Sequence, residues 1–183
     1  MKAVALYIGL VLLSYNNVST ADSYEAALAS WTSHKDVAKW LSNNFSFEKS
    51  RQKQISKRLR QQGPDGLLIR KPVNLYENNH NGYCADSANF SIQSLNKINP
   101  AYNARWVFIW NKAGRPNHWV AAFDHENKLY IMDYGTGDKW KEMQGIHGPY
   151  NSLGEYRSYL ASLEIPNFKV GEVRFRDMPG QED

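Results

Sequence analysis

The sequence has 183 residues and only one cysteine, Cys84, so no disulfide can form within the chain. It also lacks internal repeats and low-complexity stretches, so it is neither a repeat array nor a biased-composition protein. Its net charge is only +4, and the basic residues gather mainly in residues 49–60. That segment has no interleaved aromatic residues and accompanies no recognised module motif, so nucleic-acid binding is not predicted. We interpret it as a solvated helix face, with attraction of an acidic protein or anionic polymer as the alternative.

The N-terminus has the pattern of a secretory signal peptide. Lys2 precedes an apolar run at residues 3–13, and small residues at Ser19 and Ala21 indicate cleavage before Asp22. The apolar run is too short to span a bilayer, so export without a stable membrane anchor is predicted, to the periplasm or outside the cell. An uncleaved helix at the membrane edge is the alternative. We therefore expect a signal peptide at residues 1–21 and a single catalytic domain at residues 22–183.

The spacing of apolar residues changes along the chain from a helical period to a period of about two. Three helices are expected first, at 22–42, 45–62 and 84–98, followed by strands at 105–110, 117–123 and 128–133. A fourth helix at 151–163 and a final strand at 168–175 complete the chain. The glycine-rich residues 134–150 are expected to form a surface loop, and residues 178–183 a frayed tail. Helices followed by antiparallel strands indicate the α+β class.

Cys84 lies at the predicted start of the third helix. Asn81 or Gly82 can cap this helix, and Asp86 falls in its first turn, where a carboxylate is favourable. A thiol at this end faces backbone N–H groups without helical partners and the positive end of the helix dipole, which favour the nucleophilic thiolate. The alternative interpretation is a small buried apolar residue, as for most lone cysteines.

His118 and Asp133 lie on two neighbouring predicted strands. If the hairpin loop holds residues 124–127, His118 falls directly opposite Asp133, with Cβ atoms about 5 Å apart. The carboxylate would then hold the imidazole in one tautomer and stabilise its charged form. With Cys84 this makes a thiolate triad, while a strand histidine and a turn-forming aspartate remain the structural alternatives.

Four short motifs occur in an order that resembles the transglutaminase-like superfamily: Gly82-Tyr83-Cys84, Arg105-Trp106-Val107, Asn117-His118-Trp119-Val120 and Leu129-Tyr130-Ile131-Met132-Asp133. Members carry Gly-x-Cys at a helix start, His on one strand and Asp on the next. The resemblance covers about residues 78–135, and within the group the chain is most similar to bacterial periplasmic transglutaminase-like cysteine proteinases. It implies a papain-like fold in which the cysteine helix packs on an antiparallel sheet.

The resemblance implies that Cys84 attacks an amide or ester carbonyl and that its own N–H helps to hold the oxyanion. A polar side chain from the preceding loop would be the second donor. Asn78, six residues before Cys84, is the predicted donor because papain has a glutamine at a similar spacing. Asn81 and Tyr76 are the alternatives, and all three also suit a plain loop role.

Two aromatic residues beside the predicted triad, Tyr83 and Trp119, are expected to line the substrate cleft. Trp110 is a further candidate, although large aromatic residues mostly pack in the core. Related proteinases carry acidic residues around the nucleophile, used partly for calcium. Here Tyr83 and Ala85 occupy such positions and only Asp86 matches, so no metal or other cofactor is predicted.

These features together predict an exported cysteine hydrolase, a protease or amidase, that acts on a protein or peptide through a thioester acyl-enzyme. Two alternatives stay open. A transglutaminase-type acyltransferase or deamidase shares the same acyl-enzyme step. A catalytically inactive binding module would keep the fold without the reaction.

Overall fold

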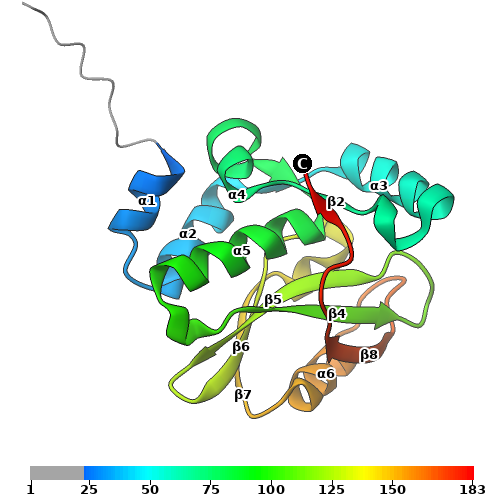
Figure 1. The fold of residues 1–183 in the computed structure, drawn as a ribbon. Helices are drawn as coiled ribbons and strands as arrows, with labels where there is room; N and C mark the ends of the chain where they lie inside the picture. The colour runs from blue at the N-terminus through cyan, green and yellow to red at the C-terminus, as the bar shows by residue number, and fades with distance from the viewer. Residues whose placement is uncertain (1–22) are drawn as a thin grey trace, which may run out of the picture.

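The computed structural model describes residues 23–183, shown in Figure 1, and the predicted signal peptide lies outside this range. The helices are α1 (Tyr24–Ser30), α2 (His34–Asn44), α3 (Lys49–Gln62), α4 (Pro72–Asn74), α5 (Cys84–Ile98) and α6 (Leu153–Ser162), with short helical turns η2 (Gly63–Gly66), η3 (Leu75–Asn79), η4 (Pro100–Tyr102) and η5 (Asp138–Met143). The strands are β1 (Ser46–Phe47), β2 (Leu68–Ile69), β3 (Asn81–Gly82), β4 (Arg105–Asn111), β5 (His118–His125), β6 (Lys128–Asp133), β7 (Gly145–Tyr150), β8 (Val170–Phe175) and β9 (Gln181–Glu182).

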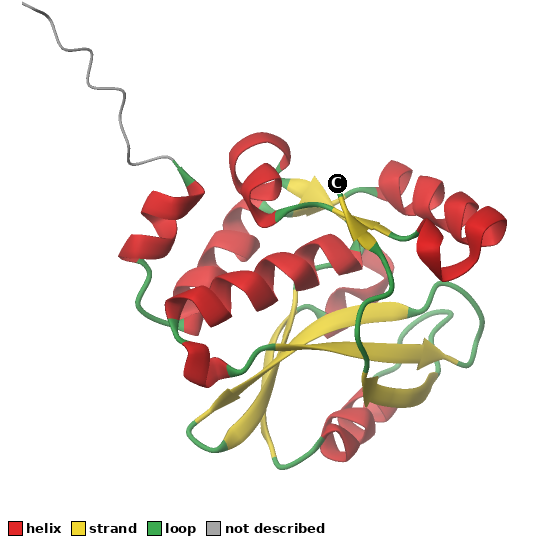
Figure 2. Cartoon of the chain, in the orientation of Figure 1, coloured by secondary structure: helices red, strands yellow, loops and turns green. Residues whose placement is uncertain are grey.

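A five-stranded antiparallel sheet in the order β7-β6-β5-β4-β8 forms the centre of the fold. Helix α5 crosses one face of this sheet and α6 covers the other (Figures 1 and 2). The remaining helices lie around α5, on the same side of the sheet. The predicted α+β class, with the cysteine helix packed on an antiparallel sheet, is confirmed.

The sheet is buried on both faces because its central strands are apolar at nearly every position. Toward α5, Ala121, Phe123 and Met132 join a core with Phe90 and Leu95. Toward α6, alternate residues of β4, β5 and β6 join a second core with Tyr156 and Leu160 of that helix: Val107, Ile109, Val120, Ala122 and Ile131. Burial on both faces holds the register of β5 and β6, which positions the site residues at the ends of these strands.

The helix predicted at residues 22–42 is two helices, α1 and α2, separated at Trp31–Ser33. The Ser23 hydroxyl accepts a hydrogen bond from the N–H of Ala26 and so caps α1. Ser33 and Asp36 cap α2 through a hydrogen bond from the Ser33 N–H to the Asp36 carboxylate at 2.9 Å. The apolar period continues across the break, which is why the sequence pattern alone does not reveal it.

The hairpin between β5 and β6 differs from the predicted register by two residues. Glu126 and Asn127 alone form the turn, both with positive φ, so Asp124 pairs with Leu129. A two-residue turn with both central residues in the left-handed region suits the right-handed twist of a hairpin. Side chains alternate with a period of two, so a shift by two residues moves His118 and Asp133 from opposed to diagonal positions but leaves them on one face.

Two segments that were predicted to be irregular form strands. Residues 145–150 of the predicted loop are β7, which completes the edge of the main sheet beside β6. Gln181–Glu182 of the predicted tail are β9, which pairs in parallel with β2. β9 has only two residues and β7 has little apolar alternation, so their pairing depends on tertiary contacts rather than on a local pattern.

Within residues 23–183, no helix has the length and apolar character needed to cross a membrane.

Candidate active site

Cys84 is the first residue of α5, and Asp86 fixes the start of this helix. The Asp86 carboxylate accepts a hydrogen bond from the N–H of Tyr83 at 3.0 Å. A Cβ on Gly82 would lie 2.6 Å from the same carboxylate oxygen, so glycine is required where the chain enters the helix. The Gly-Tyr-Cys motif therefore places Cys84 at the end of a 15-residue helix, beside N–H groups that lack helical partners.

Arg51 on α3 neutralises the buried Asp86. Its Nε lies 2.7 Å from Asp86 Oδ2 and its Nη2 lies 3.1 Å from Asp86 Oδ1, a bidentate pair. The same guanidinium binds the Asp183 side chain through Nη2 at 2.7 Å. Burial raises the pKa of Asp86 despite the opposing effect of Arg51, and the N–H of Arg70 also donates to it at 2.7 Å. Residues from three distant parts of the chain thus hold the start of the cysteine helix.

His118 and Asp133 form a buried pair behind Cys84. His118 Nε2 lies 2.6 Å from Asp133 Oδ2, and both side chains are almost fully buried. Burial lowers the pKa of His118, but the Asp133 carboxylate and an interaction with the Cys84 side chain outweigh it and raise this pKa to about 10. Because Asp133 occupies Nε2, the ring nitrogen left for Cys84 is Nδ1. The arrangement favours an imidazolium that can stabilise a thiolate.

Gly135 brings the end of β6 against the start of α5. Its N–H donates to Asp133 Oδ1 at 3.1 Å, which orients the carboxylate. A Cβ built on Gly135 would lie 2.4 Å from the Cα of Cys84, so no other residue fits without moving one backbone or the other. Gly135 is therefore the point at which the His118–Asp133 pair and the nucleophile are placed relative to each other.

We expect Gly135→Ala to reduce any reaction at Cys84 by about 10²-fold, because displacing reacting groups by about 1 Å has that effect. It should also lower the free energy of unfolding by about 1–3 kcal/mol through overpacking. Alkylation of Cys84 by iodoacetamide and urea unfolding measure the two effects. The matched control is Gly154→Ala in α6, where the new Cβ meets only the Ser152 hydroxyl, at 3.3 Å. Equal alkylation rates in both variants would contradict this role of Gly135.

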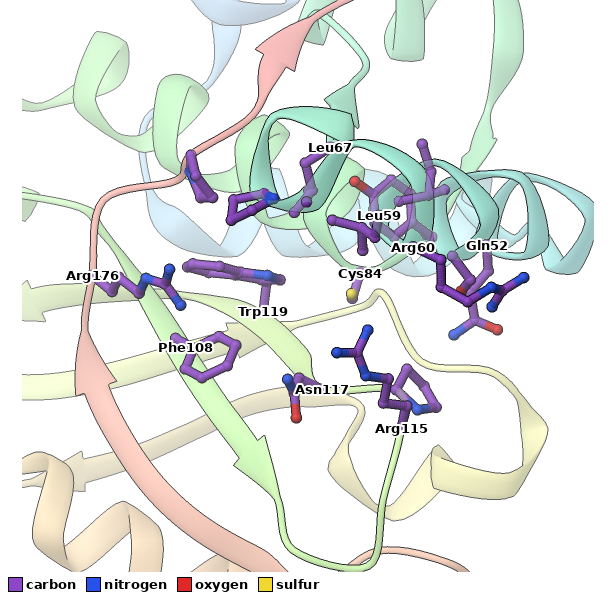
Figure 3. A pocket seen from close by; sticks show the side chains of 17 residues that line it. Gln52, Leu59, Arg60, Leu67, Cys84, Phe108, Arg115, Asn117, Trp119 and Arg176 are labelled. Carbon is purple, nitrogen blue, oxygen red and sulfur yellow. The ribbon is translucent and has the colours of Figure 1, made fainter.

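A cavity of about 360 Å³ opens onto Cys84 between α3, the β4–β5 loop and the C-terminal segment (Figure 3). Tyr83 and Trp119, the predicted cleft residues, both line it. The Tyr83 hydroxyl donates to the carbonyl of Leu68 at 2.8 Å, which holds its ring in the wall. The cavity gives a small molecule or an extended chain access to a thiol whose residue is otherwise buried.

The structure does not bring Asn78 to this cavity. Asn78 is exposed in the turn η3 and is not among the residues that line the cavity, so the geometry gives its predicted oxyanion role no support. The side-chain amides of Gln52 and Asn117 line the cavity instead. Trp110, the further cleft candidate, is 47% exposed and is not among the residues that line the cavity.

Sequence reasoning missed several residues around the site. Gln52 and Arg51 lie on the basic helix α3, more than 30 positions before Cys84, where no motif spacing points to them. Trp140 packs against the His118 ring at 5.7 Å between ring centroids, from a segment predicted to be a loop. These residues come from α3 and η5, which only the tertiary packing brings to the site.

The described residues contain no group of three or more His, Cys, Asp or Glu side chains that could bind a metal ion. Asp86, the acidic residue that matches the related proteinases, is already paired with Arg51 and two backbone N–H groups. Its carboxylate is therefore part of the framework of the site.

A thiol at a helix start, with a buried histidine–carboxylate pair beside it, defines a papain-like class of site. In a comparison with protein families, residues 17–137 match the transglutaminase-like domain. This match spans more than half of the chain and includes Cys84, His118 and Asp133, so the chain belongs to the transglutaminase-like domain family, a family of cysteine-based hydrolases and acyltransferases. No curated protein matches the chain.

Proposed function

We propose that the protein is an exported cysteine hydrolase that cleaves an amide bond in a protein or peptide. The observation that carries the proposal is the buried His118–Asp133 pair, with its 2.6 Å contact, beside a thiol that opens into a cavity. A buried ion pair of this kind costs desolvation energy and is rarely needed for stability. Its position against the only cysteine supports a catalytic role.

In the proposed reaction, the Cys84 sulfur attacks the carbonyl carbon of the amide and forms a tetrahedral intermediate. His118 then donates its proton to the leaving amine as the C–N bond breaks, which leaves a thioester on Cys84. Neutral His118 next accepts a proton from water, and the resulting hydroxide cleaves the thioester and releases the acid. Asp133 keeps its carboxylate on Nε2 throughout and so orients the ring toward Cys84.

The oxyanion would be held by the N–H of Cys84 at the helix start, where the helix dipole adds to the hydrogen bond. The cavity offers side-chain amides for the second hydrogen bond. The Asn117 oxygen already accepts a hydrogen bond from the N–H of Asn111 at 3.1 Å, which fixes that side chain. Gln52 extends from α3 to the same cavity and is the donor we assign.

Export is part of the proposal and rests on the signal-peptide pattern of residues 1–21. An acyltransferase would form the same thioester and pass the acyl group to an amine in place of water. Incubation with a fluorescent amine and a protein acceptor separates the two reactions. Release of new termini without amine incorporation supports the hydrolase, and incorporation supports the transferase.

Iodoacetamide labelling across pH, followed by intact mass, tests the activated thiol directly. The imidazole of His118 keeps its proton in the folded protein up to a pKa of about 10, whereas an ordinary histidine loses it near 6.5. The imidazolium therefore persists throughout the neutral range and stabilises the thiolate there. We expect rapid labelling at one site, with a rate that falls little down to about pH 6, well below the free-thiol pKa of about 8.5.

In Asp133→Asn, burial lowers the pKa of His118 without a carboxylate to oppose it, so the ring becomes neutral in the physiological range. Labelling near pH 6 should then fall at least tenfold, to the order expected of an ordinary thiol. Asp124→Asn is the matched control, because Asp124 lies on the same hairpin in an ion pair with Arg105 whose side chains are 39% and 38% exposed. Equal pH profiles for the wild type and Asp133→Asn would remove Asp133 from the mechanism.

A further inference from the structure

Three arginines from separate elements line the cavity at Cys84. Arg60 comes from the end of α3, Arg115 from the β4–β5 loop, and Arg176 from the segment after β8. Figure 3 shows Arg60 and Arg115 on one side of Cys84 and Arg176 beside Trp119 on the other. The positive charge therefore lies at both ends of the opening rather than in one patch.

These arginines have no acidic partner in the described part of the chain. Each ion pair found within residues 23–183 involves other basic residues. Among the residues that the structure describes, no carboxylate lines the cavity, and Asp65 and Asp177, which neighbour lining residues in the sequence, are exposed and outside it. Arg176 instead lies over the rings of Phe108, at 5.1 Å, and Trp119, at 5.8 Å. The cavity therefore carries an uncompensated positive potential.

Between the arginines, the wall of the cavity is apolar. Leu59 and Ile55 face it from α3, Leu67 from the segment before β2, and Phe108 and Trp119 from the sheet. Ile55, Leu67 and Trp119 are buried within one core cluster, so this surface is firmly supported. A side chain that fills such a wall gains hydrophobic energy in proportion to the apolar area it covers.

From this arrangement we infer that the site takes an acidic peptide, in which an apolar side chain lies beside the reacting amide and carboxylates flank it on both sides. The inference rests on the proposed function only for the statement that an amide bond of the peptide reacts at Cys84. The apolar side chain contacts the wall at Leu59 and Trp119. The carboxylates on one side pair with Arg60 and Arg115, and those on the other pair with Arg176, while like charge repels basic peptides.

Binding of short fluorescent peptides to the Cys84→Ala protein, followed by anisotropy, tests the inference without any turnover. The first peptide has a central leucine–glutamine pair flanked by glutamates, and matched peptides carry glutamine or lysine in place of the glutamates. We expect the acidic peptide to bind most tightly, the neutral one more weakly and the basic one least. Added salt should weaken the acidic peptide selectively, since it screens exposed charges.

Each of Arg60→Gln, Arg115→Gln and Arg176→Gln should weaken the acidic peptide by roughly twofold to fivefold, the range for exposed ion pairs, and leave the neutral peptide unchanged. Lys53→Gln and Lys112→Gln are the matched controls. They remove the same charge from the same helix and the same loop, at exposed positions outside the cavity, and should bind like the parent protein.

Equal binding of the three peptides, or equal effects of the control and arginine variants, would overturn the inference. A peptide whose leucine is replaced by glycine, if it binds as well as the acidic parent, would also overturn it, because any polyanion would then suffice. Binding with this pattern but without iodoacetamide labelling of the wild type would leave the peptide site standing and refute the hydrolase. Rapid labelling of Cys84 without selective binding of the acidic peptide would support the activated thiol and refute the acidic-peptide site.

Discussion

Cys84→Ala is expected to abolish hydrolysis, lowering the rate by about 10⁴-fold or more, as removal of a triad nucleophile does in other hydrolases. The fold should survive, because the change from thiol to methyl removes little volume from a residue that packs against Ala85 and Trp119. We expect the free energy of unfolding to change by about 1 kcal/mol or less. Release of peptide termini and urea unfolding measure the two quantities.

The activity that remains in Cys84→Ala shows whether another group in the protein can act as the nucleophile. Cys84 is the only thiol in the chain, so any activity left in Cys84→Ala has to come from a hydroxyl or from bound water. Activity within tenfold of the wild type would show that Cys84 is not the nucleophile and would favour the binding-module interpretation. Loss of activity together with loss of folding would be resolved by Cys84→Ser, which keeps a polar group of similar size at the cavity.

Arg51→Leu should cause the largest loss of stability, about 3–5 kcal/mol in the free energy of unfolding. The substitution leaves the Asp86 carboxylate, whose side chain is 0% exposed, buried without a counter-charge. It also removes the ion pair with the Asp183 side chain, one of several contacts that hold the end of the chain after β9. Urea unfolding near neutral pH measures the loss, and iodoacetamide labelling reports whether the start of α5 has moved.

The acid dependence of this effect has a definite sign. Burial already raises the pKa of Asp86, and removal of Arg51 raises it further, so the folded variant binds a proton that the unfolded chain does not. The deficit of Arg51→Leu should therefore shrink as the pH falls and Asp86 becomes neutral. For the same reason the double variant Arg51→Leu/Asp86→Asn should recover much of the lost stability, since the asparagine can still accept from the Tyr83 N–H.

Arg174→Leu is the matched control, because Arg174 pairs with Glu172 at 3.1 Å where the side chains are 48% and 52% exposed. An exposed pair of this kind contributes about 0–1 kcal/mol. If Arg51→Leu and Arg174→Leu had equal effects, the buried network could not be what holds the start of the cysteine helix. A deficit that did not shrink in acid would likewise show that Asp86 is not the source of the loss.

The Arg51 network also joins the region that matches the family, residues 17–137, to the C-terminal segment that follows it. The family match ends at residue 137, after Asp133 and Gly135. Arg176 and Asp183 lie in the C-terminal segment outside the match, yet Arg176 lines the cavity and Asp183 binds Arg51. The candidate triad thus lies in the matched region. The C-terminal segment supports the start of the cysteine helix through Asp183 and, in our inference, contributes to substrate selection through Arg176.

The sequence by itself determined the α+β class and the residues of the candidate triad. Periodicity is a local property, and the Gly-Tyr-Cys, His and Asp motifs carry their chemistry in a few neighbouring residues. The hairpin shows how robust this is: the predicted register was wrong by two residues, yet His118 and Asp133 stayed on one face because side chains alternate with a period of two.

Only the tertiary structure decided what surrounds these residues. Arg51 and Asp183 are 132 positions apart, and Gly135 and Cys84 meet across the turn after β6, so no local pattern records either contact. The same holds for Asn78, which has the right spacing in the sequence but lies outside the cavity, and for Gln52, which has no spacing signal and lies inside it. Spacing along a chain fixes distances only within one element, whereas the neighbours of an active site come from elements that packing brings together.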